Sequence, residues 1–157
     1  MNAKICDQQY GDGLEGEHLD RAARALASAR LAVAVTGAGI SVESGIPDFR
    51  SADGLWSRYP PEEFATIEAF HDDPDRVWIM WYELAETLGN ARPNPAHYAL
   101  ARLEKAGRLA GVITQNIDAL HHRAGSETVV EFHGRADAIV CPACGRVHDL
   151  AHVLAEP

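Results

Sequence analysis

Apolar residues along the chain follow two patterns: short continuous runs, and stripes that repeat every three or four positions. Continuous runs bounded by turn-forming residues are typical of strands buried on both faces of a parallel sheet. We expect such strands over Leu31–Val35, Leu109–Thr114 and Thr128–Phe132. The stripes predict helices over Glu17–Arg30, from Pro74 to Gly89 and from Pro95 to Gly107, with a shorter helix over Ile117–Arg123.

Two of these helices begin with a capping signal. Asp73-Pro74 and Asn94-Pro95 each place a capping side chain before a proline, which suits the first helical position. Residues 51–70 have no clean period and are interrupted by Pro60-Pro61, so we expect a long loop with short helical pieces there. Because helices and apolar runs alternate along the chain, the order predicts an α/β layered fold with a mainly parallel sheet.

Composition narrows the class of protein. The 157 residues are 46% apolar and 24% charged, which is ordinary for one globular domain. The net charge of −9 disfavours nucleic acid, whose nonspecific binding depends on Lys and Arg. No apolar run approaches the ~20 residues of a membrane span. Residues 1–16 are expected to be a flexible extension without the character of a secretory signal, so a cytoplasmic location is expected.

A glycine-rich turn follows the first expected strand. Gly37-Ala38-Gly39 is a candidate phosphate loop, since glycines let backbone N–H groups approach an anion closely. The dinucleotide fingerprint has a third glycine where this chain has Val42, so a plain strand–helix turn stays open as an alternative. The next segment, Ser44–Ser51, presents Pro47, Asp48, Phe49 and Arg50, which suit a flat heterocycle and its ribose. The alternative is a solvated turn with a surface ion pair.

Polar residues also follow the second and third expected strands. Gln115, Asn116 and Asp118 stand where ligands bind in open α/β sheets, outside the carboxyl ends of the strands. Asn116 is alternatively a helix cap. His133 comes at the end of the third run and is a candidate general base. We interpret the other histidines as surface or cap residues (His18, His71, His97, His148 and His152) or as possible auxiliaries near the site (His121 and His122).

Cys141 and Cys144 form a CxxC pair, which suits half of a structural zinc site. His148 and His152 would complete a compact four-ligand arrangement, although its spacing is shorter than that of a usual zinc finger. A redox pair is a further alternative that lacks the thioredoxin-like context. The third cysteine, Cys6, lies alone near the N-terminus, so the odd count speaks against a disulfide framework.

The segments GAGIS, SGIPDFRS, TQNID, FHG and CPAC stand in an order and at separations that resemble the sirtuin family, the NAD-dependent protein deacylases. The resemblance extends from about Leu19 to Gly145. It implies a Rossmann-like NAD domain with a smaller zinc-and-helix module. It also implies NAD-binding parts at about 17–50 and 108–136, a helical insertion at about 51–107 and the first half of the zinc module at about 137–157.

The resemblance assigns roles position by position. It implies that Gly37, Ala38 and Gly39 bind the NAD phosphates. The residues that it implies around nicotinamide and its ribose are Ile46, Asp48, Phe49, Arg50, Gln115, Asn116, Ile117 and Asp118. The catalytic residues would be His133, Asn116 and Asp118, and the zinc ligands Cys141 and Cys144. In the implied reaction an acyl-lysine amide oxygen attacks C1′ of the nicotinamide ribose, nicotinamide leaves, and His133 deprotonates a ribose hydroxyl.

The implied partner is an acyl-lysine protein or peptide, with no nucleic acid and no membrane. Sirtuins that prefer succinyl groups carry a Tyr-x-x-Arg pair, and the matching stretch Trp81–Leu84 has no arginine, so we expect acetyl or another neutral acyl group. Three alternatives stay open: an inactive module that binds NAD or ADP-ribose, a mono-ADP-ribosyltransferase, and a small zinc-dependent interaction module.

The family's second CxxC and its later strands have no counterpart before Pro157. We therefore expect these residues to be the N-terminal part of a sirtuin. A sheet cut after about three strands exposes an edge and an apolar face, and two thiolates bind zinc less well than four. The 157 residues alone are accordingly expected to be poorly stable and nearly inactive.

Overall fold

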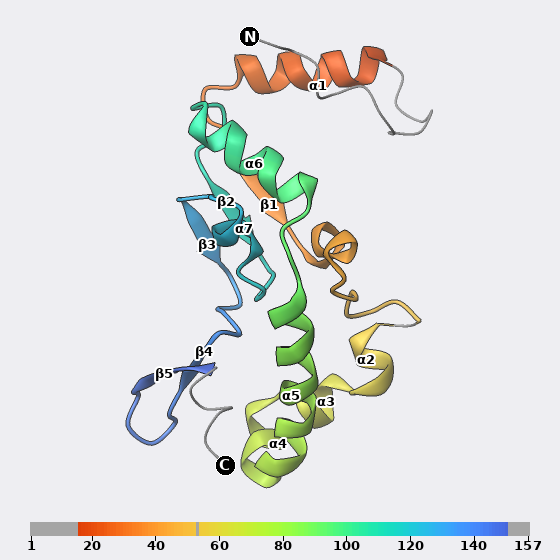
Figure 1. Cartoon of the computed structure of the whole chain (residues 1–157), viewed down its shortest axis with the longest axis vertical. Helices are drawn as coiled ribbons and strands as arrows, with labels where there is room; N and C mark the ends of the chain where they lie inside the picture. The colour runs from red at the N-terminus through yellow and green to blue at the C-terminus, as the bar shows by residue number, and fades with distance from the viewer. Residues whose placement is uncertain (1–15, 53, 151–157) are drawn as a thin grey trace.

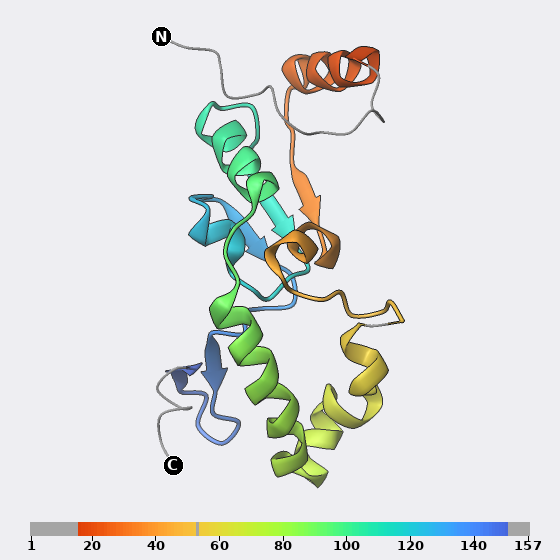
Figure 2. The ribbon, with the colours of Figure 1, turned by 45° about the vertical axis from the view of Figure 1, so that its right-hand side comes forward.

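The computed structural model describes residues 16–52 and 54–150, so that the expected extension up to residue 15, Cys6 and His152 lie outside the described residues. Its centre is a parallel sheet of three short strands in the order β1 (Ala34–Thr36), β2 (Val112–Thr114) and β3 (Val129–Glu131). The α/β class with a Rossmann-like parallel sheet is confirmed. Since all three strands run in the same direction, the segments that follow them emerge at one edge of the sheet (Figure 2).

The sheet differs from the prediction in one respect. Its strands were expected to be buried on both faces, yet Val35 is 72% exposed and its register partners Ile113 and Val130 are exposed too. Successive residues of a strand point to opposite faces, so these three side chains share one face, which no other described element covers. The expected strands therefore form in the right places, but the sheet is buried on one face only.

The helices that follow the capping signals are confirmed. In α5 (Pro74–Asn90) the Asp73 side chain accepts from the Arg76 N–H, and in α6 (Pro95–Lys105) the Asn94 side chain accepts from the Ala96 N–H. His97 also accepts from the Asn94 N–H and completes a capping box. His97 is completely buried, so it is a cap residue as predicted but not a surface residue.

The first helix, α1 (Gly16–Ser28), forms as predicted but has no buried residue among the described ones. Its apolar stripe includes Leu19, which is exposed. Helical propensity and an amphipathic pattern are local properties, whereas the surface that covers a helix is not. The pattern therefore predicts the helix but not its burial.

Short helices do occupy the segment read as a loop with helical pieces: α2 (Leu55–Arg58), α3 (Pro61–Phe64) and α4 (Ile67–Asp72). They pack beside α5 in the lower part of the molecule (Figure 1). Leu55 of α2 meets Met80 and Leu84 of α5 in a buried cluster, with the rings of Phe49 and Trp56 packed against it. This cluster ties the segment after the glycine turn to α5.

Two more elements complete the described chain. The glycine turn leads into a 3-10 helix, η1 (Ala38–Ser44), and α7 (Leu120–Arg123) is shorter than predicted. Strands β4 (Ala138–Val140) and β5 (Val147–Asp149) form a separate antiparallel hairpin, which carries the CxxC pair at its turn. Among the described residues, no helix is both long enough and apolar enough to span a membrane. The domain boundaries given above stay predictions.

Candidate functional site

A cleft of about 560 Å³ opens at the carboxyl ends of the strands. Its volume lies within the range usual for small-molecule sites, about 300–1,000 Å³. Most predicted nucleotide contacts line it, namely Ala38, Gly39, Asp48, Phe49, Arg50, Gln115, Asn116, Ile117 and His133. Segments that are far apart in the sequence thus meet at one place.

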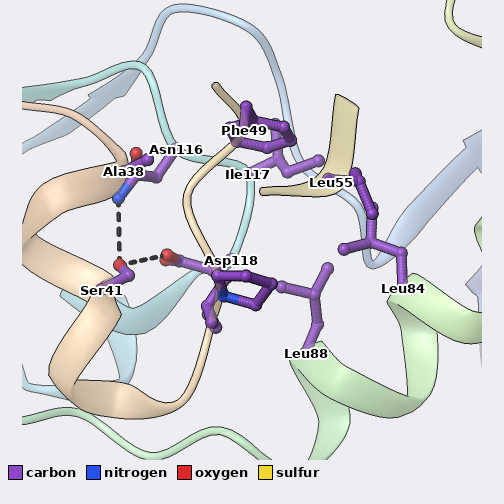
Figure 3. A pocket seen from close by; sticks show the side chains of 11 residues that line it. Ala38, Ser41, Phe49, Leu55, Leu84, Leu88, Asn116, Ile117 and Asp118 are labelled. Atoms are coloured by element: carbon purple, nitrogen blue, oxygen red, sulfur yellow. Dashed lines mark hydrogen bonds between the residues drawn. The ribbon is translucent and has the colours of Figure 1, made fainter. Parts of the chain in front are cut away.

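A small recess of about 20 Å³ adjoins this cleft (Figure 3). It shares Ala38, Phe49, Asn116 and Ile117 with the cleft and adds Ile46 and Asp118, two further predicted residues. Gly37 lines neither space, but its carbonyl oxygen accepts a hydrogen bond from Asn116 Nδ2 at 3.1 Å. The structure therefore places every predicted nucleotide contact in or beside the cleft; the roles given to them stay predictions.

Ser41 is a buried residue of this site that the sequence interpretation missed. Its hydroxyl donates to Asp118 Oδ2 at 2.6 Å and accepts from Asn116 Nδ2 at 3.0 Å. Figure 3 shows these three side chains in a row between η1 and the segment after β2. Residues three apart share a face of a 3-10 helix, so the spacing of Ala38 and Ser41 was the available signal, provided that the helix type was known.

The alternative role of Asn116 as a helix cap is wrong. Helix α7 begins after Ala119, whose φ of 57° is left-handed, and its first N–H, that of Leu120, donates to Asp118 Oδ1 at 2.9 Å. Asp118 thus binds the helix start with one oxygen and Ser41 with the other. The helix therefore starts three residues later than expected, after the left-handed Ala119.

Asp48 and Phe49 are held by a tight loop. The backbone oxygens of Asp48 and Phe49 accept from the N–H groups of Leu55 and Trp56, each at 3.0 Å. The Asp48 carboxylate accepts from the Ser51 N–H at 2.9 Å, and hydrogen bonds from Ser51 lower the pKa of this carboxyl. The surface ion pair considered for Asp48 is thus replaced by a loop contact, which keeps Asp48 as a carboxylate at the cleft.

His133 lies at the cleft with one nitrogen engaged. Its Nδ1 is 3.0 Å from the backbone oxygen of Gln115. Because a carbonyl oxygen can only accept, Nδ1 must carry the proton in this contact, and the neutral ring keeps the lone pair of Nε2 free. The imidazole is thereby oriented as a proton acceptor through Nε2. His121 and His122 are not among the residues that line the cleft.

One wall of the cleft is apolar and combines residues of the expected loop segment with residues of α5. It consists of Leu55, Trp56, Ala65, Met80, Trp81 and Leu84. The periodic pattern of α5 places Trp81 and Leu84 on the apolar face of a helix, but it contains no signal that separates core from cleft. Their place in the site depends on α2 and α3 folding back along α5.

Comparison with known proteins decides the family. The profile of the Sir2 family matches residues 37–157. The chain belongs to the Sir2 family. Within it, the chain is 57% identical to "NAD-dependent protein deacylase 2" of Pyrobaculum aerophilum, over 80% of this chain and 50% of that protein. It is 56% identical to "NAD-dependent protein deacylase" of Aeropyrum pernix, over 78% of this chain and 50% of that protein.

Solved Sir2 structures have the same arrangement. A mutant Sir2 homologue in complex with ADP-ribose superposes with a TM-score of 0.80 at 45% identity, covering 83% of this chain and 53% of that one. A Sir2 homologue in complex with NAD superposes with a TM-score of 0.78 at 43% identity, and the match covers 91% of this chain and 54% of that one. The Sir2 chain described here therefore spans about half the length of the curated relatives it matches.

Cys141 and Cys144 of this Sir2 chain do not line the cleft. Cys141 and Cys144 are free thiols on the β4–β5 hairpin, and the N–H groups of Cys144 and Ala143 lower the pKa of the Cys141 thiol. Within residues 16–52 and 54–150, no group of three or more His, Cys, Asp or Glu side chains is arranged to hold a metal ion. His148, paired with Ile139 across the hairpin, supplies no third ligand there.

Proposed function

We propose that the chain provides the nucleotide and acyl-lysine site of an NAD-dependent protein-lysine deacylase. The observation that carries this proposal is the single cleft that joins the glycine turn, the Asp48–Arg50 loop, the Gln115–Ile117 segment and His133. The matched relatives named as NAD-dependent deacylases and the structures with NAD or ADP-ribose support the choice of ligand.

The residues at the cleft suit a dinucleotide. No heavy atom lies within 4 Å of the place where a Cβ on Gly39 would stand, so the turn leaves open space beside its backbone. Arg50 brings a guanidinium to the same cleft, and such a group pairs well with phosphate. Bound NAD would supply a glycosidic bond to nicotinamide that is ready to break. The protein's part is to orient the two reactants, which contributes much of the acceleration in such reactions.

We assign proton acceptance to His133. The Gln115 carbonyl fixes the ring with the Nε2 lone pair free, so His133 takes a proton from a ribose hydroxyl through Nε2. Asn116 and Asp118 act by position, since their side chains are joined to Gly37, Ser41 and the start of α7. A positioned general base contributes about 10²–10⁴ in rate.

We also propose that the acyl group is neutral, acetyl rather than succinyl. Trp81 and Leu84 bring apolar surface to the cleft at the stretch where a succinyl-binding arginine is expected in sirtuins. A carboxylate next to this wall would lose hydration, and the stretch Trp81–Leu84 offers it no cationic partner. An acyl-lysine protein or peptide is the proposed partner.

Zinc is a separate proposal. Cys141 and Cys144 would provide two thiolates of a structural site, and the lowered pKa of Cys141 favours the thiolate form that binds metal. The described residues supply two donors, so the remaining ligands would lie outside them. Zinc content of the purified chain, measured by atomic absorption before and after Cys141→Ser, tests this proposal.

Nucleotide binding tests the main proposal before turnover does. Calorimetry should show that the chain binds ADP-ribose, and a chain that fails to bind ADP-ribose or NAD at millimolar concentration refutes the proposal. Turnover is measured as deacetylated peptide formed from NAD and an acetyl-lysine peptide, with the chain in excess, and nicotinamide release is followed as the preceding step.

His133→Ala should retain ADP-ribose binding and lower the rate of peptide deacylation about 10²–10⁴-fold, because the proton transfer assigned to His133 follows nicotinamide release. Binding without any nicotinamide release would instead favour an inactive nucleotide-binding module. This is the second candidate function, because the chain covers only about half of each matched relative. Transfer of labelled ADP-ribose onto protein would indicate an ADP-ribosyltransferase.

A further inference from the structure

Two buried histidines that the proposed reaction does not use lie side by side near the glycine turn. His97 on α6 and His121 on α7 are 0% and 2% exposed, with ring centroids 4.9 Å apart. Among the described residues, His97 Nε2 and His121 Nδ1 have no hydrogen-bond partner. A buried polar atom without a partner is unfavourable, so this arrangement calls for a compensating role.

The other nitrogen of each ring makes a hydrogen bond, that of His121 to the residue before the turn and that of His97 to Asn94. His121 Nε2 is 2.9 Å from Oγ1 of Thr36, the last residue of β1 and the neighbour of Gly37. His97 Nδ1 accepts from the Asn94 N–H at 3.4 Å. The histidine pair is therefore joined directly to the start of the turn and to Asn94.

Asn94 carries the second connection into η1. Its Nδ2 donates to the Ile40 backbone oxygen at 2.6 Å and to Ser44 Oγ at 3.0 Å. Both acceptors belong to the 3-10 helix that presents Ala38 and Gly39 to the cleft. The two histidines thus hold this helix from both sides, one through Thr36 and the other through Asn94.

The hydrogen positions of the pair are complementary when both rings are neutral. Because the Asn94 N–H donates to His97 Nδ1, neutral His97 carries its proton on Nε2. When His121 donates from Nε2 to the Thr36 hydroxyl, its Nδ1 is an acceptor. The two unpartnered nitrogens are then one donor and one acceptor on adjacent rings. Burial lowers the pKa of both histidines, and this supports the neutral forms.

We propose that His97 and His121 are positioning residues for the nucleotide-facing turn. They fix Thr36 and Asn94, and thereby set where Ala38 and Gly39 stand in the cleft. Neither histidine lines the cleft, so both act through other residues. The inference rests on the proposed function for the identity of the ligand, whereas the placement of the turn is a property of the free chain.

The experiment separates the turn from the ligand. Thr36→Val removes the hydroxyl at nearly constant shape, His121→Phe removes the ring nitrogens, and His121→Gln restores a polar group within reach of Thr36. The matched control is Thr87→Val, which removes a half-buried hydroxyl that donates to the Glu83 oxygen at 3.2 Å within α5. Amide hydrogen exchange of residues 38–44 is measured on the free chain, and ADP-ribose affinity by calorimetry, at a temperature where circular dichroism shows each variant folded.

Thr36→Val and His121→Phe should raise exchange over residues 38–44 and weaken ADP-ribose binding about tenfold or more, because a small misplacement of a binding group is enough for such a loss. His121→Gln should recover most of both, and Thr87→Val should change neither. If amide exchange over residues 38–44 is no faster in Thr36→Val than in Thr87→Val, the inference is overturned, whatever the affinity for ADP-ribose. Faster exchange together with no ADP-ribose binding by the unmutated chain supports the inference and refutes the proposed function. If His121→Phe does not fold, Thr36→Val decides alone.

Discussion

Ser41→Ala removes one hydroxyl from the buried row that joins η1 to the segment after β2. The side chain is 1% exposed and binds Asp118 at 2.6 Å and Asn116 at 3.0 Å. Alanine fits the same space without either bond. The perturbation is therefore a change in hydrogen bonding at nearly constant volume.

The magnitude follows from what each bond joins. A hydrogen bond to a charged group contributes about 1.5–3 kcal/mol and a neutral one about 1 kcal/mol. Asp118 keeps its bond from Leu120, and Asn116 keeps its bond to Gly37. We therefore expect Ser41→Ala to lower the free energy of unfolding by about 3 kcal/mol. For a domain of this size that is a fall in melting temperature of about 6–12 °C.

Urea denaturation followed by circular dichroism measures this change. The control is Ser57→Ala, which removes one neutral bond, from Ser57 Oγ to the Gly54 oxygen at 2.7 Å, at an exposed residue. Ser57→Ala should lower the free energy of unfolding by about 1 kcal/mol or less. If Ser41→Ala destabilises the chain no more than Ser57→Ala does, the buried row does not hold the two segments together and the reasoning is refuted.

Three further predictions concern single positions. Gly39→Ala should leave the unfolding free energy within about 0.5 kcal/mol and weaken ADP-ribose binding, because its Cβ meets open space at the cleft; calorimetry beside urea denaturation tests this, and unchanged binding would contradict the place given to the nucleotide. Gly54→Ala should lower both stability and binding in the same assays, since its Cβ would lie 2.8 Å from the Asp48 backbone oxygen; full stability would contradict that contact. Burial lowers the pKa of His121 from 6.5 to about 4. As pH falls, His121 is therefore protonated in the unfolded chain before it is protonated in the folded chain. The free energy of unfolding should therefore fall by about 3 kcal/mol as pH drops from about 6.5 to about 4. If the free energy of unfolding of His121→Phe falls with the same slope as that of the unmutated chain, another group is responsible.

Local signals in the sequence account for much of the fold. The cap residues Asp73 and Asn94 start α5 and α6 as predicted, because capping depends on a few neighbouring residues. The meeting of the glycine turn with Gln115 and Asn116 was also predictable, since the carboxyl ends of parallel strands share an edge of the sheet. What these features have in common is that each follows from spacing within one or two elements.

Features that depend on distant partners were not predictable in this way. Val35 and Leu19 have the pattern of buried residues and are exposed, because nothing in the described chain covers them. His97 was read as a surface or cap residue, and only the packing of α6 on α7 buries it. Trp81 and Leu84 resemble core residues in the pattern of α5, and the path of α2 and α3 turns their face into a cleft wall.

The polar residues whose contacts the sequence did not reveal share a physical reason. Ser41, Thr36 and His121 are polar side chains whose partners lie on another segment, so their burial is favourable only when both segments are already in place. An apolar side chain in the same position would fit many relative placements of the two segments, whereas a hydrogen bond fits few. The cleft lies between those segments. The proposed reaction holds a sugar beside the His133 imidazole, and a site of that kind depends on this polar layer to keep its groups in place.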